Sequence, residues 1–379
     1  MLIGIDASRA CKTTRTGTEY YSQEIIKALA RIDHQNFYVL YSPITPPREL
    51  SDLPRKFNWK IIPFPRFWSQ IRLSWELQTQ SPRPDVMFEP AHTVPLLHPI
   101  PMVVTIHDLG FKYYPELYTK FENYYHNFSA NFSARHSSAI IAVSNYTRND
   151  ILKHLAVPAK KVTTVYHGVD KQIFRLPNLK EQKTPLGFNI KQPYIFYIGR
   201  LEHKKNIVNL IKAYQLLREE KKITHQLVLG GKPGFGYEAI QQAVDNVSPA
   251  VAKDIIQTGY ISNEEYPIIL KNADIFAFPS NFEGFGMPVL EAMACGVPVV
   301  CSNKTSMPEV AQNAGLLINP QKPFDMAVAF SKIINKPSLR SSLISKGNKR
   351  ASLFTWDNAA RKTLEILEKT GNYHPNNGR

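Results

Sequence analysis

The sequence predicts an α/β fold with two domains, each built on a mainly parallel sheet. Short apolar segments alternate along the chain with longer segments in which apolar residues recur every three or four positions. Alternating strands and helices are typical of parallel sheets, because parallel neighbours need a crossover connection. The 379 residues exceed the usual size of one core, and a polar stretch at 171–191 interrupts the alternation. We therefore expect one domain at 1–180 and a second at 190–352.

In the first half of the chain, polar residues directly follow one of the predicted strands. Strands are expected at 2–6, 37–41, 84–88, 102–106, 139–143 and 162–166, and helices at 18–31, 116–136 and 145–155. His107 and Asp108 follow the strand at 102–106, and open α/β sheets bind ligands at the carboxyl ends of their strands. His107 is therefore a candidate for acceptor binding or polar catalysis, with a purely structural imidazole as the alternative.

The second half repeats the alternation and adds a basic loop. Strands are expected at 194–198, 226–230, 255–258, 274–278 and 298–301, and helices at 206–218, 237–246, 263–271, 323–335, 338–350 and 355–369. Arg200 follows the first of these strands, and Lys205 precedes the next helix. Fixed charge and the dipole of a helix start could hold a diphosphate there, with a solvated basic turn as the alternative.

Residues 280–300 carry two carboxylates, Glu283 and Glu291, on either side of a glycine-rich loop. A short helix is expected to begin at Pro288, because proline suits the first turn of a helix. Backbone N–H groups at this helix start would point outward, those of Gly286, Met287 and Val289. Such groups suit an anion or a sugar.

The net charge of +15 is spread along the whole chain. Residues 1–185 carry 23 Lys and Arg against 15 Asp and Glu, and the remainder carries 23 against 16. Such a field favours polyanions, namely nucleotide diphosphates, an anionic membrane surface or nucleic acid, with plain solubility as the alternative. The start of the sequence lacks the pattern of a signal peptide, and no apolar run could span a membrane. The three cysteines indicate a reducing compartment, so we expect a cytoplasmic protein.

Ligands for a metal ion are not evident in the sequence. The cysteines lack metal-ligand spacing, and neither an Asp-x-Asp motif nor a P-loop occurs. We therefore expect no metal site, and we expect protein cations to neutralise any bound diphosphate.

Residues 57–75 hold three of the four tryptophans and interleave aromatic with basic side chains. One interpretation is a patch that contacts an anionic membrane peripherally, at its inner face. The favoured alternative is that the aromatic side chains pack inside the domain while the cations are solvated. A nucleic-acid surface uses the same ingredients, but no nucleic-acid motif accompanies them, so we expect no nucleic-acid partner.

Several of these segments also carry a family resemblance. They are the stretch EGFGMPVLEAMACGVPVV from Glu283, Gly199–Glu202 with Lys205 and Asn206, Thr258–Ser262, and Ser306–Val310. They resemble the large retaining glycosyltransferase family called group 1, or family 4. The resemblance covers nearly the whole chain and is most specific in 194–320. The segments Thr105–Asp108 and Arg15–Gly17 are most similar to mannosyltransferase-type members that build bacterial surface polysaccharides.

The resemblance implies a GT-B fold, in which two Rossmann-like domains face a central cleft. It implies an acceptor-binding domain at 1–180, completed by a returning helix at about 355–370, and a nucleotide-sugar-binding domain at 190–352. The implied function is retaining transfer of a hexose, with mannose favoured and glucose as the alternative. The donor would be a nucleotide diphosphate sugar (GDP-mannose favoured, a UDP-sugar as the alternative), with no cofactor required. The acceptor would be a glycan or a lipid-linked saccharide. A non-catalytic sugar-nucleotide-binding subunit is the alternative of another class.

The resemblance also implies roles for single residues. Glu291 would bind the ribose, Glu283 would face the donor sugar, and Arg200 with Lys205 would bind the diphosphate. His107 would lie near the donor sugar and the acceptor. The remaining implied donor contacts are Gly17 in the first loop, Phe285, Gly286 and Met287 through their backbone, and Ile261 beside the base. The chain departs from the family at two positions, with Glu19 where relatives often have a second glycine and His167 where they commonly have asparagine.

Overall fold

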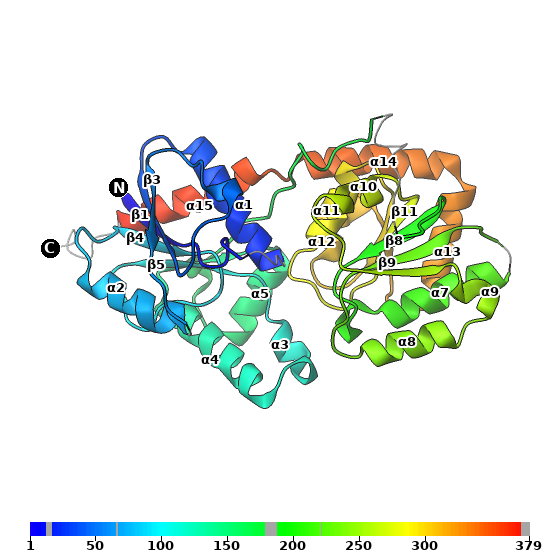
Figure 1. The fold of residues 1–379 in the computed structure, drawn as a ribbon, viewed down its shortest axis with the longest axis horizontal. Helices are drawn as coiled ribbons and strands as arrows, with labels where there is room; N and C mark the ends of the chain where they lie inside the picture. Colours follow the sequence, from blue (N-terminus) through cyan, green and yellow to red (C-terminus); the bar gives the residue numbers. More distant parts are fainter. Residues whose placement is uncertain (13–16, 66, 179–187, 221, 373–379) are drawn as a thin grey trace. The chain divides into compact units, whose positions relative to one another are not determined.

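The computed structural model describes residues 1–12, 17–65, 67–178, 188–220 and 222–372. The chain forms two compact units and passes between them twice (Figure 1). The first unit comprises Met1–Gly168 together with the chain from Thr355 onward, and the second comprises Val169–Phe354. Part of the polar stretch predicted as a linker, residues 179–187, lies outside the described residues.

The first unit is built on a seven-stranded sheet in the order β3-β2-β1-β4-β5-β6-β7, with every neighbouring pair parallel. Its strands are β1 Leu2–Asp6, β2 Phe37–Ser42, β3 Phe57–Ile61, β4 Val86–Glu89, β5 Met102–Ile106, β6 Ala139–Ala142 and β7 Val162–Thr164. Six of these strands were predicted from the sequence. The strand that was missed is β3, which lies at the edge of the sheet in the aromatic-rich segment.

Helices cover both faces of this sheet, with α1 and α15 on one side and α2 and α4 on the other (Figure 1). They are α1 Gly17–Ile32, α2 Ser74–Thr79, α3 Gly110–Tyr113, α4 Lys120–His136, α5 Asn145–His154 and α15 Trp356–Gly371. A π-helical turn at Trp68–Leu73 leads into α2. The returning helix α15 packs beside α1, where the Arg31 guanidinium binds the Asp357 carboxylate at 2.7 Å.

The single helix expected over 116–136 is wrong in its first turn. A short 3-10 turn covers Pro115–Leu117, and α4 begins only at Lys120. Thr119, two residues after the turn, is extended and caps α4, because its hydroxyl accepts from the Glu122 N–H while the Glu122 carboxylate accepts from the Thr119 N–H.

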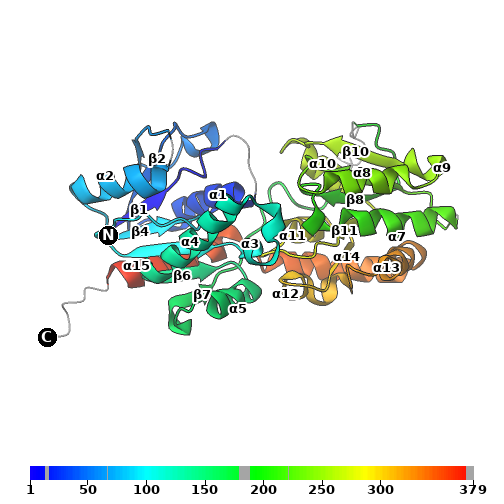
Figure 2. The ribbon, with the colours of Figure 1, turned by 90° about the horizontal axis from the view of Figure 1, so that it is seen from below.

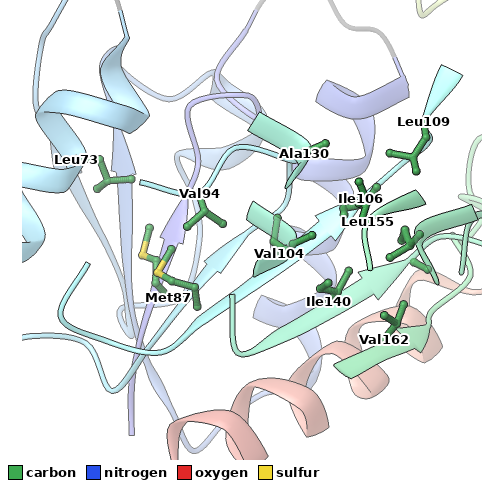
Figure 3. Close-up of a cluster of buried hydrophobic side chains, with 14 of the residues drawn as sticks. Leu73, Met87, Val94, Val104, Ile106, Leu109, Ala130, Ile140, Leu155 and Val162 are labelled. Atoms are coloured by element: carbon green, nitrogen blue, oxygen red, sulfur yellow. The ribbon is translucent and has the colours of Figure 1, made fainter. Parts of the chain in front are cut away.

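The core beneath α2 and α4 is formed by alternate residues of the central strands (Figure 3). Met87, Val104, Ile106 and Ile140 point from β4, β5 and β6 into a cluster that Ala130 of α4 completes. These strands are buried on both faces, because helices lie above and below them, and this explains why they appear in the sequence as continuous apolar runs.

The second unit has a six-stranded sheet in the order β10-β9-β8-β11-β12-β13, again with parallel neighbours throughout. Its strands are β8 Tyr194–Ile198, β9 Gln226–Gly230, β10 Ile255–Gly259, β11 Ile275–Phe278, β12 Val299–Ser302 and β13 Leu316–Ile318. Five were predicted, and the three-residue β13 was missed. Two sheets of parallel strands confirm the predicted α/β class.

Helices also alternate with the strands of this unit. They are α7 Ile207–Glu219, α8 Tyr237–Asp245, α9 Pro249–Ala252, α10 Glu265–Lys271, α11 Met287–Ala294, α12 Met307–Ala311, α13 Pro323–Asn335 and α14 Pro337–Ser352. Because all strands are parallel, every loop that leaves a strand opens at one edge of the sheet. The loops after β8, β10, β11 and β12 contain most of the residues singled out from the sequence.

Candidate functional site

An ion pair joins two of these loops at the edge of the second sheet. The Lys205 ammonium, in a 3-10 turn at His203–Lys205 after β8, lies 2.5 Å from the Glu283 carboxylate in the loop after β11. Both side chains are only 14% exposed, so the pair is shielded from water and its two charges are held in place. The Asn281 N–H donates to the Lys204 carbonyl at 2.8 Å and fixes the two loops through the backbone as well.

Asn206, next to Lys205 in the chain, joins several loops near this ion pair through its side-chain amide. It adopts a left-handed conformation between the 3-10 turn and α7, and it is buried. Its amide donates to the Pro320 carbonyl after β13 at 2.6 Å and to the Pro279 carbonyl after β11 at 3.3 Å. One side chain therefore ties together the loops that follow three strands.

The Glu283 loop is held from the side of β12 as well. The Glu283 N–H donates to the Thr305 hydroxyl at 3.2 Å, and the Ser306 hydroxyl lies 3.0 Å from the carbonyls of both Glu283 and Phe285. Gly286 ends the loop with φ of +96°, and a Cβ there would lie 2.2 Å from Cε of Met307. Only glycine fits this turn, which fixes where α11 begins.

The start of α11 differs in one respect from the expectation. The sequence analysis predicted that the Val289 N–H would point outward, free for a ligand. Instead it donates to the Gly286 carbonyl at 3.1 Å, because the first turn of the helix closes over Pro288. Any anion at this helix start would have to be bound by other N–H groups.

Glu291 lies on α11 and is buried. Its carboxylate accepts a hydrogen bond of 2.6 Å from the hydroxyl of Tyr266 on α10. Burial raises the pKa of Glu291 from 4.5 to about 7, although the Tyr266 hydrogen bond acts in the opposite direction. Near neutral pH this carboxyl therefore exchanges readily between its neutral and ionised forms, and a ligand that donates hydrogen bonds would favour the ionised form.

Two glycines bring the ends of β8 and β9 into close contact. Gly231 has φ of +139°, and a Cβ there would lie 1.9 Å from the Gly199 carbonyl oxygen. Arg200 follows this contact and is exposed, and its carbonyl accepts from the buried Tyr197 hydroxyl at 3.2 Å. The backbone under Arg200 is therefore fixed while its guanidinium is accessible, as binding of a diphosphate would require.

Of the remaining residues predicted for the donor, Ile261, Phe285 and Met287 also lie in the second unit. Ile261, two residues after β10, is buried and packs against the end of β9, where its Cδ1 would lie 2.6 Å from a Cβ at Gly230. Phe285 is buried and its ring lies 6.0 Å from that of Phe354, whereas Met287 is half-buried at the first position of α11.

His107 and Gly17 belong to the first unit. His107 follows β5, and its Nε2–H donates to the Pro90 carbonyl at 2.8 Å, so Nδ1 is the acceptor in the neutral ring. Burial lowers the pKa of His107, which keeps the imidazole neutral near pH 7. Gly17 is the exposed first residue of α1, and residues 13–16 before it lie outside the described part of the chain.

The two departures from the family have structural explanations. Glu19 is buried and its carboxylate pairs with the Arg9 guanidinium at 3.1 Å. His167 is buried beside Tyr21 at 4.7 Å between ring centroids and stacks on Trp356 at 5.9 Å. Tyr21 in turn lies 4.8 Å from His107, so His167 belongs to an aromatic cluster behind His107.

Sequence reasoning missed Tyr266, Thr305 and Asn206 as partners of the candidate residues. Asn206, and Ser306 next to Thr305, lie inside segments that carry the family resemblance, so the resemblance could have pointed to them. Among the described residues, no three His, Cys, Asp or Glu side chains gather as metal ligands would. No helix in the described ranges is long and apolar enough to cross a membrane.

Comparison with known proteins agrees with the sequence and the fold. Residues 179–350 match the family model for "Glycosyl transferases group 1", and residues 15–173 match that for "Glycosyltransferase Family 4". An O-antigen chain mannosyltransferase B of Escherichia coli is 34% identical over 272 residues, which are 70% of each chain. This chain belongs to the group 1, family 4 glycosyltransferases. The predicted family is thereby confirmed, and the chain is a glycosyltransferase.

Other relatives of this glycosyltransferase are more distant. An MMP alpha-(1->4)-mannosyltransferase of Mycolicibacterium hassiacum is 27% identical over 61% of this chain and 54% of its own. The serotype-specific mannosyltransferase WbdA of Escherichia coli is 26% identical over 60% of this chain, which spans only 28% of WbdA.

Solved structures confirm the predicted GT-B fold. HepE of Anabaena in complex with UDP-glucose superposes with a TM-score of 0.76 and 17% identity, covering 97% of this chain and 99% of its own. WaaG, a glycosyltransferase involved in lipopolysaccharide biosynthesis, superposes with a TM-score of 0.71 and 14% identity. The superposition covers 97% of this chain and 99% of WaaG.

Proposed function

We propose that this glycosyltransferase moves a mannosyl group from GDP-mannose to a glycan or lipid-linked saccharide in surface polysaccharide synthesis. The proposal is supported by the named activities of the relatives, of which several are mannosyltransferases. Glucose as the sugar and a UDP-sugar as the donor are the alternatives, since HepE binds UDP-glucose. The structural observations that carry the proposal are the ion pair between Lys205 and Glu283 at the edge of the second sheet and the buried Glu291 carboxylate on α11.

In this proposal the second unit binds the donor. Arg200 and Lys205 bind the diphosphate, the ionised Glu291 accepts hydrogen bonds from the ribose hydroxyls, and Ile261 lies beside the base. Glu283 faces the sugar, with backbone groups of 285–287. Negative charge grows on the diphosphate as the glycosidic bond breaks, so the fixed cations contribute the main electrostatic stabilisation of the transition state.

We propose further that the anomeric configuration is retained by attack on the same face of the sugar. The departing phosphate then accepts the proton of the acceptor hydroxyl, and no covalent sugar–enzyme intermediate forms. His107, neutral and with Nδ1 as its acceptor, is the proposed contact of the first unit with the transferred sugar. Trapping a covalent glycosyl adduct on any side chain would contradict this mechanism.

The first unit is proposed to bind the acceptor, and Gly17 is proposed to contact the donor from the start of α1. If the acceptor is linked to a lipid, the enzyme must work at the surface of the membrane that holds it. We therefore propose a cytoplasmic enzyme in peripheral contact with the inner face of an anionic membrane.

Thermal unfolding with a panel of nucleotide diphosphate sugars tests the donor. A ligand that binds only the folded protein stabilises it by about 2.7 kcal/mol at a hundred times its dissociation constant. GDP-mannose is expected to raise Tm more than UDP-glucose, and a reversed order would redirect the donor assignment. NMR of the product's anomeric proton then tests retention, and release of free sugar from the donor separates an enzyme from a non-catalytic binding subunit.

A further inference from the structure

The first unit exposes aromatic side chains in two rows on neighbouring elements. On α4 the exposed fractions are 69% for Phe121, 72% for Tyr124 and 47% for Phe128. These residues are spaced three and four apart, so they form one stripe along the helix. The opposite side of α4 is buried against the sheet through small residues, among them Ala130 and Ala134. An exposed helix face is normally polar, so this stripe needs a partner.

The second row lies on the π-helical turn and α2. Phe67 is 53% exposed, Ile71 52% and Trp75 66%, while Trp68 between them is buried. The spacing of four residues places Ile71 and Trp75 on one side of this segment, whereas Phe67 precedes the turn in a left-handed conformation. The structure thus assigns only part of the aromatic segment 57–75 to the surface, because Phe57 is also buried.

The two rows lie on neighbouring elements, and we call their exposed residues Phe67, Ile71, Trp75, Phe121, Tyr124 and Phe128 together the aromatic face. The Gln70 amide beside the first row donates to the Tyr125 hydroxyl on α4. In both views α2 and α4 lie on the same side of the unit (Figures 1 and 2).

Basic side chains frame the aromatic face. Lys120 and Arg135 lie near the two ends of α4, are exposed, and form no ion pair with any described residue. The one carboxylate of α4, Glu122, accepts from the N–H and the hydroxyl of Thr119 at the cap of the helix. On the other row, the buried Glu76 is neutralised by Lys60 and Arg72. The face is therefore apolar in its middle and positive around it.

We propose that the aromatic face docks the enzyme onto an anionic lipid surface. Aromatic rings of this kind settle at the headgroup level of a bilayer, and nearby Lys and Arg side chains are attracted to anionic lipid. A second copy of this chain fits less well, because it would bring like charges together in a protein of net charge +15. The biological role of this docking rests on the proposed function, because it would bring the enzyme to a lipid-linked acceptor. Vesicle binding itself needs neither donor nor acceptor.

Co-sedimentation of the full-length protein with lipid vesicles tests the proposal. Wild type is expected to bind phosphatidylglycerol-rich vesicles more tightly than pure phosphatidylcholine vesicles, and less tightly in 0.5 M salt. Substituting Phe121, Tyr124 and Phe128 together by Ser should weaken binding by about tenfold or more. The matched control is Phe324→Ser with Leu216→Ser, which removes exposed apolar side chains from the second unit. Thermal unfolding of each variant checks that the fold is kept.

Trp75 supplies an internal probe of the docked state. It is 66% exposed, whereas Trp68 and Trp356 are buried and Trp59 is half-buried. Its emission is expected to shift to the blue on anionic vesicles and to be quenched by brominated lipid, and Trp75→Phe should remove most of that signal.

Three results would overturn the proposal. They are vesicle binding by the triple variant at the wild-type level, quenching that persists undiminished in Trp75→Phe, and a wild-type dimer that the triple variant abolishes. Retained transfer to a soluble acceptor in a variant that has lost vesicle binding would separate this docking role from the glycosyltransferase activity.

Discussion

Replacing the buried Glu291 by glutamine should make the protein more stable at alkaline pH. Burial raises the pKa of this carboxyl from 4.5 to about 7, a difference that corresponds to about 3 kcal/mol. Between these two values the folded state binds more protons than the unfolded state. The wild type therefore has this stabilisation in full below about pH 4.5 and loses it as the pH rises through about 7. Glutamine keeps the size of the side chain and an oxygen for the Tyr266 hydroxyl, but it does not ionise.

Thermal unfolding of wild type and Glu291→Gln at pH 5 and pH 8 measures this effect. For a unit of this size 1 kcal/mol corresponds to roughly 2–4 °C in Tm. The Tm of the variant relative to wild type should therefore rise by roughly 5–10 °C between the two pH values. A Tm difference between the two proteins that does not change with pH would refute the assignment of a raised pKa to Glu291.

The same carboxyl should make donor binding depend on pH. Hydroxyl groups of a ribose donate best to an ionised carboxylate, so donor affinity should increase as the pH rises from 6 to 8. The diphosphate of a nucleotide sugar stays ionised over this range and adds no titration of its own. In Glu291→Gln the affinity should be weaker and independent of pH. Isothermal titration with a non-hydrolysable donor analogue measures both, and an equally steep pH profile in the variant would exclude a ribose role for Glu291.

Four further substitutions test other parts of the site. Lys205→Ala and Arg200→Ala should each lower kcat/KM by an amount equivalent to about 2–4 kcal/mol, because each removes a positive charge from the proposed diphosphate site. Steady-state kinetics measure kcat/KM, and near-wild-type values in both variants would refute the assignment. Gly231→Ala should lower Tm markedly, because the added Cβ would lie 1.9 Å from a carbonyl oxygen of the chain, and an unchanged Tm would contradict the close contact. Ser306→Ala removes the buried hydroxyl that lies 3.0 Å from two carbonyls of the 283–285 loop, so Tm should fall by a few degrees and donor affinity by roughly threefold to tenfold. A titration with unchanged affinity would show that this loop needs no such support.

Which strands could be predicted from the sequence depended on their burial. The strands at 102–106, 194–198 and 226–230 agree with the structure residue for residue, because two covered faces make each an apolar run. The edge strand Phe57–Ile61 alternates apolar and polar residues, and its tryptophan and lysine also fit a surface patch. The strand Leu316–Ile318 is too short to produce a pattern.

The candidate site could be located from sequence motifs, but its contacts could not. Glu283 and Lys205 were expected to face a sugar and a phosphate separately, and nothing in a sequence separation of 78 residues indicates that they form an ion pair. The hydrogen bond from Tyr266 to Glu291 depends on how α10 packs against α11. Exposure was equally inaccessible, because Trp68 and Trp75 carry the same residue type and only the fold decides which of them is buried.

The ion pair between Lys205 and Glu283 links the proposed diphosphate site to the proposed sugar site of the donor. A shielded ammonium with a carboxylate 2.5 Å away is already largely neutralised, so it attracts a diphosphate less than a free lysine would. A bound diphosphate competes with Glu283 for this ammonium. When the Lys205 ammonium pairs with the phosphate, it neutralises the Glu283 carboxylate less. The negative charge of Glu283 is then less neutralised at the place where the sugar is proposed to lie. Positive charge develops on that sugar in the transition state, so binding of the leaving group and stabilisation of the sugar become coupled through one short contact.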